Sequence, residues 1–179
     1  MSPLSSGIIV GGSTNIYSRN FVLSHLPQAT GLPSPPTGPD EHPPGEWASH
    51  LKVLPYECVR DERDISPPFL RFLITLPPCR EPMLRDSIPW NAVDLNEEIG
   101  KLAEHVEAAY MFMVGRRIEL ECALCQLGGG VFPYCVVIDY EDGQSECCNC
   151  HWECTTDGCW LLGKRGQYFF QSSFYEESL

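Results

Sequence analysis

The chain has 179 residues, a formal net charge of −12 at pH 7 and an apolar fraction of 43%. This length predicts one domain, or one domain with a tail, and the composition allows a modest core. The acidic balance argues against unaided binding to nucleic acid or to an anionic membrane surface, because both depend on Lys and Arg contacts. No stretch approaches the roughly 18 apolar residues that a membrane helix needs.

Whether the cysteines are reduced or form disulfides depends on the compartment of the protein. The first twenty residues contain no basic region before an apolar run, and the run at residues 7–10 is too short for the core of a signal peptide. We therefore expect an intracellular protein, nuclear or cytoplasmic, whose ten cysteines stay reduced. Clustered thiols then bind metal more often than they form disulfides, and disulfides in a secreted chain are the alternative.

Residues 1–50 are predicted to form a disordered tail rich in Pro, Ser and Gly. Half of the sixteen prolines fall before residue 45, and branched apolar side chains are scarce around them. Such a segment cannot bury enough surface to offset the entropy of ordering.

Residues 51–117 are predicted to be an extended segment with one strand and one helix. The strand is residues 69–76, because prolines flank this apolar run on both sides. The helix spans residues 94–114, where Asp94 and Glu97 form a start signal and Gly115 follows the end. Apolar residues recur on one face at helical spacing: Leu95, Ile99, Leu102, Val106, Ala109 and Met113. His105 and the glutamates lie off this face, and His105 is predicted to be solvated.

Residues 118–179 are predicted to be a cysteine-rich, zinc-binding module with an aromatic C-terminal segment. A strand is expected at 135–140, followed by a hairpin turn at Glu141–Asp142–Gly143. The aromatic residues at 167–175 are expected to form a last strand folded onto the helix. The predicted fold is therefore α+β: short antiparallel strands, stapled by zinc, packed on one main amphipathic helix.

Six cysteines are the candidate metal ligands, with the spacing C-x2-C-x9-C-x11-C-x2-C-x8-C: Cys122, Cys125, Cys135, Cys147, Cys150 and Cys159. A two-residue spacer lets one tight turn direct two sulfurs at the same ion, and four thiolates satisfy tetrahedral zinc. Either the two Cys-x-x-Cys pairs hold one Zn²⁺, or all six cysteines hold two. Cys148, Cys154 or His151 could replace one of the six.

The six-cysteine spacing is similar to that of the binuclear zinc-cluster family of fungal transcription factors, in which the first and fourth cysteines bridge two zincs. This resemblance implies that Cys122 and Cys147 are the bridges. The spacer that corresponds in this family to residues 126–134 is shorter and rich in Arg and Lys that contact DNA, whereas residues 126–134 here are neutral and mostly apolar. The resemblance extends to coordination and does not extend to the DNA-contacting residues.

A second resemblance covers residues 122–162. The Cys-x-x-Cys pair, then Phe132-Pro-x-Cys-Val-Val137, then Cys147-x-Asn-Cys150 and Cys159 resemble a fungal cysteine-rich domain family of unknown function. It implies a fungal intracellular protein with a compact cysteine module, and it implies no activity.

The sequence is compatible with three functions. We expect a non-enzymatic zinc-binding module that binds another protein. Residues 118–162 contain eight acidic side chains and no Lys or Arg, so the expected partner has a basic surface. The alternative is a zinc-cluster nucleic-acid binder, which requires Arg116, Arg117, Lys164 and Arg165 to converge on one face. A zinc hydrolase or deaminase-like enzyme could use His105 and Glu107, but the required Pro-Cys-x-x-Cys is absent.

Overall fold

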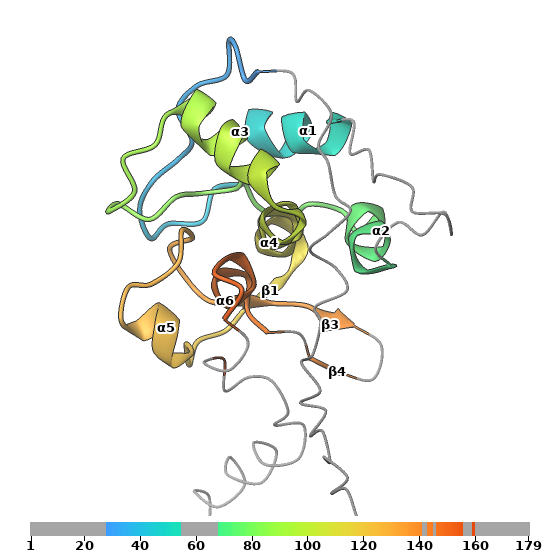
Figure 1. Ribbon diagram of the computed structural model, residues 1–179, viewed down its shortest axis with the longest axis vertical. Helices are drawn as coiled ribbons and strands as arrows, with labels where there is room; N and C mark the ends of the chain where they lie inside the picture. Colours follow the sequence, from blue (N-terminus) through green and yellow to red (C-terminus); the bar gives the residue numbers. More distant parts are fainter. Residues whose placement is uncertain (1–27, 55–67, 141–142, 145, 156–158, 160–179) are drawn as a thin grey trace, which may run out of the picture.

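The computed structural model describes residues 28–54, 68–140, 143–144, 146–155 and 159 (Figure 1). Within these residues the fold is α+β, with two small antiparallel sheets. The helices are α1 (Glu46–Val53), α2 (Pro68–Thr75), α3 (Ala92–Lys101), α4 (Ala103–Val114), α5 (Ala123–Gln126) and α6 (Cys148–Trp152). The strands are β1 (Arg116–Arg117), β2 (Val136–Val137), β3 (Asp139–Tyr140) and β4 (Gly143–Gln144). None of the helices in these ranges is long and apolar enough to cross a membrane.

Helix α4 is the centre of the molecule. It contacts α2, α3, α6 and β2. Figure 1 shows α3 above it, α2 beside it and α6 below it. Every residue from Ala103 to Met113 is buried, which is the burial expected of a helix surrounded by the core. Phe112 stacks on Phe132 with ring centroids 4.7 Å apart, so α4 also supports the loop that leads into β2.

The predicted single helix at 94–114 is two helices, α3 and α4. Leu102 has extended backbone angles (φ −135°, ψ 149°) and interrupts the helix between them. Gly100, a weak helix former, is the local sequence signal for this break. The helix also starts earlier than predicted: Asn91 is the N-cap, and its side chain and that of Asp94 form a reciprocal capping box.

The strand predicted at 69–76 is wrong, because these residues form helix α2. Pro68 occupies the first helical position, where a missing N–H costs nothing, so proline marks the start of a helix here. Leu70 and Leu73 are three residues apart and both buried, and α2 packs against α4. An apolar run of eight residues fits a buried helix as well as a strand, and the contact with α4 decides between them.

The described part of the predicted disordered tail, residues 28–50, is ordered. Trp47 on α1 is fully buried, and its indole N–H donates to the carbonyl oxygen of Pro33 (3.0 Å). The Glu81 carboxylate accepts hydrogen bonds from the backbone N–H groups of Gly45, Trp47 and Ala48 at the start of α1. These long-range contacts offset the ordering entropy. Residues 1–27 lie outside the described residues.

The strands are shorter than predicted. β1 pairs with β2, with Arg116 opposite Val137 and Arg117 opposite Val136, and β3 pairs with β4 as a hairpin. The strand predicted at 135–140 is therefore divided between two sheets, with Ile138 between the two parts. The turn residues Glu141 and Asp142, and the aromatic segment at 167–175, lie outside the described residues.

Candidate metal centre

Both Cys-x-x-Cys pairs have the same local geometry. Cys122 is the N-cap of α5 and Cys125 is its third residue, while Cys147 is the N-cap of α6 and Cys150 its third residue. One helical turn thus brings both sulfurs of each pair to the same side. The backbone N–H of Cys150 donates to the Cys147 Sγ (3.5 Å).

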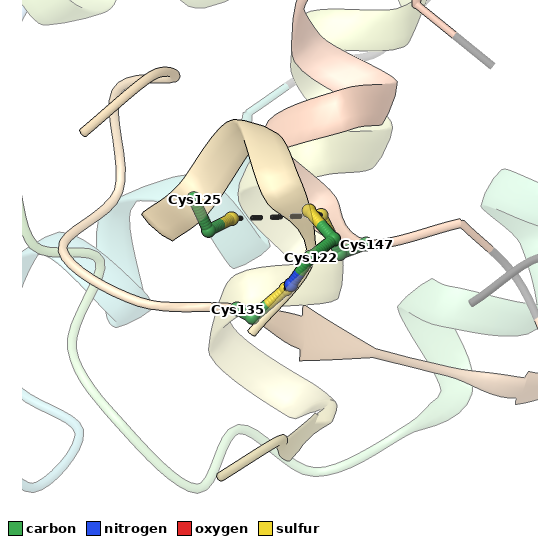
Figure 2. Close-up of side chains that lie close together, drawn as sticks. All are labelled: Cys122, Cys125, Cys135 and Cys147. Carbon is green, nitrogen blue, oxygen red and sulfur yellow. Dashed lines mark hydrogen bonds between the residues drawn. The ribbon is translucent and has the colours of Figure 1, made fainter. Parts of the chain in front are cut away.

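The six predicted cysteines lie together in two overlapping groups. The first group, called the first position below, consists of Cys122, Cys125, Cys135 and Cys147, whose Sγ atoms all lie within 4.8 Å of one another. In the second position, the same holds for Cys122, Cys147, Cys150 and Cys159. Cys122 and Cys147 belong to both positions, and all six side chains are buried. Figure 2 shows Cys125 and Cys147 facing each other across the first position, with Cys135 approaching from the chain before β2.

The sulfur–sulfur distances fit a shared metal ion. Cys122 Sγ lies 3.6 Å from Cys147 Sγ and 3.7 Å from Cys150 Sγ, and Cys125 Sγ lies 3.8 Å from Cys147 Sγ. A Zn–S bond of about 2.3 Å gives a tetrahedron whose edge is about 3.8 Å. A disulfide needs about 2.05 Å, and no disulfide joins any two of the described cysteines. The donor set therefore suits one tetrahedral ion in each position.

The pKa values of the clustered thiols shift in different directions. Hydrogen bonds with the Cys135 and Cys147 side chains lower the pKa of Cys125 to about 3, although burial acts in the opposite direction. The same interaction with Cys125 raises the pKa values of Cys135 and Cys147. Burial raises the pKa of Cys122. One thiolate is thus stabilised by its protonated neighbours, and those protons must leave when an ion enters.

Asn149 lies directly beside the cysteines and is fully buried. Its side-chain nitrogen is 3.3 Å from Cys125 Sγ, 3.1 Å from the Phe132 carbonyl oxygen and 3.3 Å from that of Tyr134. Its Oδ1 accepts a hydrogen bond from the backbone N–H of Phe132 (2.9 Å). The Cys-x-Asn-Cys pattern includes Asn149 but predicts no role for it, because three of its contacts are with Phe132 and Tyr134 and the fourth is with Cys125 on α5, all at least fifteen residues away in the chain.

Three further candidate ligands lie outside both groups. The Cys148 Sγ packs in the apolar core, 3.9 Å from the Tyr134 carbonyl oxygen. Cys154 is exposed. His151 uses both ring nitrogens elsewhere: Nε2 lies 2.8 Å from Glu107 and Nδ1 lies 2.7 Å from Glu146. Burial lowers the pKa of His151, but these two carboxylates outweigh it and raise the pKa to about 9, so the ring is cationic at neutral pH.

His105, which was predicted to be solvated, and Glu107 are both buried on α4 and contact α6. His105 stacks on Trp152 with parallel rings 3.9 Å apart, and its Nδ1 lies 2.6 Å from the Glu98 carbonyl oxygen. Glu107 faces His151, as described above. The helical pattern placed both residues on a polar face, and no local signal indicated that a second helix covers that face.

Two basic residues flank the module in β1. Arg116 lies 3.6 Å from Asp139, and the Arg117 guanidinium lies over the Tyr134 ring (4.1 Å) and 3.9 Å from Glu41. Successive residues of a strand point to opposite faces, so these two cations diverge. Lys164 and Arg165 lie outside the described residues.

An open depression of about 640 Å³ adjoins α5. It is lined by Arg117, Ile118, Glu119, Leu120, Glu121 and Gln126. Leu120, which lines the depression, is 54% exposed, and Leu127, the residue after α5, is 88% exposed. Glu121 connects the depression with the cysteines, because its carboxylate accepts a hydrogen bond from the backbone N–H of Cys135 (3.1 Å).

Comparison with known proteins places this centre inside a recognised domain. A family model described as "Protein of unknown function (DUF3716)" matches residues 108–161. No curated protein and no solved structure matches the chain. The match begins within α4 and includes all six cysteines, Asn149 and His151. A DUF3716 domain, whose function is unknown, therefore covers residues 108–161 of this chain.

Proposed function

We propose that this chain is a non-enzymatic zinc-binding module that binds another protein, and that its six cysteines hold two Zn²⁺ ions bridged by Cys122 and Cys147. One observation carries the metal assignment: the two four-sulfur groups share two cysteines. Two separate sites would need eight ligands, and the overlap satisfies two tetrahedral ions with six.

Zinc is the ion that best suits this donor set. Tetrahedral all-thiolate sites select zinc or iron–sulfur clusters, and two Cys-x-x-Cys pairs on short helical turns are typical of structural zinc. Four thiolates complete the coordination of each ion and leave no open position for a substrate or water. His105 and Glu107, the residues that an enzyme would need, are engaged by Trp152 and His151. These contacts support a structural centre.

Charge supports a protein partner. Six thiolates outweigh two divalent ions, so the loaded cluster keeps a net negative charge within an acidic module. The depression beside α5 combines exposed Leu120 with Glu119 and Glu121, which suits a partner that presents an apolar residue surrounded by Lys or Arg. An intracellular compartment of a fungal cell stays the expected location, since such a cluster needs reduced thiols.

The first test is zinc per chain, measured by elemental analysis on full-length protein prepared under reducing conditions. Two zincs per chain, with all thiols still titratable after acid release, are expected. A Cys122→Ser variant should lose both ions, because Cys122 belongs to both positions, whereas Cys154→Ser should lose neither. A chain that binds no zinc, or whose cysteines are oxidised to disulfides, would overturn the metal assignment.

Nucleic-acid binding remains the alternative because of the spacing that this chain shares with fungal zinc clusters. A double-stranded DNA titration at several salt concentrations separates the two functions. A DNA-binding module should bind at low salt and weaken steeply as salt rises. We expect no binding at any salt concentration, since Arg116 and Arg117 diverge and each lies near an acidic residue.

A further inference from the structure

We propose that the basic partner docks in the depression beside α5 and that the metal centre builds this surface, so that only the metal-loaded chain binds the partner. This inference rests on the proposed function and adds the control of partner binding by metal occupancy. Its basis is a set of contacts that joins both walls of the depression to the candidate metal ligands.

Cys135 holds the wall of the depression that follows β1. Its carbonyl oxygen accepts a hydrogen bond from the backbone N–H of Ile118 (3.0 Å), and its own N–H donates to the Glu121 carboxylate (3.1 Å). The backbone N–H of Cys122 donates to its sulfur (3.5 Å). Residues 118–122 therefore contact one candidate ligand at three points along their length, so the path of this wall depends on the position of Cys135.

The other wall of the depression is the short helix α5. The side chain of Gln126, on this helix, donates to the Glu121 carbonyl oxygen (2.6 Å) and so joins the two walls. Helix α5 has only 4 residues, far fewer than the roughly 12–15 that an isolated helix needs in water. Two candidate ligands, Cys122 and Cys125, are its N-cap and its third residue. An ion that binds both sulfurs fixes this turn and Gln126 with it.

Apolar packing connects the depression with the sulfurs as well. Ile118 lines the depression and packs, like Leu124 of α5, against the buried cluster that contains the six cysteines. Hydrogen bonds between thiols, at 3.6–3.8 Å here, are weak, whereas metal–sulfur bonds contribute their binding energy to folding. Release of the metal should therefore loosen both walls of the depression together.

The lining suits a partner segment that places an apolar side chain between Lys or Arg residues. Leu120 is 54% exposed and offers apolar surface to such a side chain. Glu119 and Glu121 flank it in the chain and bring two carboxylates to the lining. Arg117 also lines the depression, but its guanidinium lies 3.9 Å from the Glu41 carboxylate, which balances its charge. Because the loaded metal centre is itself negative, basic residues around the apolar one are favoured.

Fluorescence anisotropy with labelled peptides tests the proposal on the full chain. The probes are a panel of short peptides with one Leu, Met or Phe flanked by Lys or Arg, and each control peptide has Gly in place of the apolar residue. At least one probe should bind the zinc-loaded chain more tightly than its control does. Chelation of zinc should weaken this binding by about 10-fold or more, because the walls must then be ordered on binding.

Two leucines locate the site. Leu120→Ala should weaken the binding of the probe by about 5- to 10-fold with zinc content unchanged, because it removes the exposed apolar side chain of the lining. Leu127→Ala is the matched control, because Leu127 is more exposed and lies outside the lining. It should leave the affinity for the probe unchanged.

Two glutamates separate charge from the link to the metal centre. Glu119→Ala and Glu121→Ala each remove one carboxylate from the lining, and Glu121 additionally accepts the hydrogen bond from Cys135. With zinc bound, Glu121→Ala should weaken the probe more than Glu119→Ala does. Glu121→Gln keeps an acceptor oxygen and should weaken the probe only as much as Glu119→Gln. This comparison uses loaded protein and does not depend on how the chain folds without metal.

The outcomes that contradict the proposal are distinct. Equal binding to loaded and chelator-treated chains, or equal losses in Glu119→Ala and Glu121→Ala, would overturn the control by metal. If the loaded chain binds no probe in the panel, or binds the Gly controls equally well, the depression is not the docking surface, and the two-zinc cluster is unaffected. A chain without zinc would instead overturn the proposed function itself.

Discussion

Gly130 and Asn149 share a narrow space beside the cysteine cluster. A Cβ atom at Gly130 would lie 2.4 Å from both the Cβ and the Oδ1 of Asn149, closer than any real contact. Gly130 also has a positive φ of 77°, which L side chains rarely adopt. The loop at Gly130 can pass this close to Asn149 only because glycine has no side chain and tolerates a positive φ. Gly130 therefore helps to place Asn149 beside the candidate metal ligands.

We therefore expect Gly130→Ala to displace Asn149 and to weaken zinc binding. Gly128→Ala is the matched control, because Gly128 has nearly the same φ (78°) and no heavy atom within 4 Å of the added Cβ. The control should cost about 1–2 kcal/mol from backbone strain alone. Urea denaturation and zinc content should show a larger loss in Gly130→Ala. Equal effects of the two substitutions would contradict the contact with Asn149.

The elements are decided by what they pack against. Residues 68–75 form helix α2 where a strand was predicted, and residues 92–114 form two helices where one was predicted. Helices α2 and α3 both pack against α4. Leu70 and Leu73 are both buried and lie on one face of α2, which packs against α4, as residues three apart in a helix do. In a strand these two residues would point to opposite faces, and Leu70 would instead share a face with Ile74.

At this scale we expect Leu70→Ala and Leu73→Ala each to lower the free energy of unfolding by about 2–5 kcal/mol. Ile74→Ala should cost about 1 kcal/mol or less, because that side chain is 38% exposed. Chemical denaturation of the three variants gives the comparison. A large loss for Ile74→Ala together with a small one for Leu73→Ala would indicate a strand.

At the scale of the whole molecule, the described residues form two apolar clusters that meet at α6. The larger one surrounds α4 and includes Cys148 and Trp152 of α6, while the smaller one contains the six cysteines, with Val137. Helix α6 contributes to both clusters, so the proposed ion held by Cys147 and Cys150 would stabilise the packing of α6 on α4. The protonated His151 adds an ionic contact between the same helices.

Stabilisation by zinc should depend on pH with a definite sign. The ligands bind as thiolates, and the raised pKa values of Cys135 and Cys147 mean that the metal-free cluster holds protons that zinc must displace. Protons compete more strongly as pH falls, so zinc affinity and the stability linked to it decrease. The Tm difference between loaded and chelator-treated chains should be larger at pH 8 than at pH 6. A difference that is constant, or larger at pH 6, would contradict thiolate ligation.

Local spacing was enough to select the six cysteines and to indicate an α+β fold, because a Cys-x-x-Cys pair on one turn needs no distant residue to orient its sulfurs. The hairpin of β3 and β4 was likewise visible locally. The overlap of the two sulfur groups required the tertiary structure, since it brings Cys135 and Cys159 to the two helical pairs.

Other features depend wholly on long-range contacts. Residues 28–50 are ordered by Glu81 and by burial of Trp47, and composition alone predicted disorder. His105 and Glu107 are buried because α6 covers a face that the helical pattern left polar. Asn149 has its role through a loop about fifteen residues away. The sequence by itself determined which sulfurs could gather, and the tertiary structure decided which helices, loops and polar side chains hold them there, because those contacts join residues far apart in the chain.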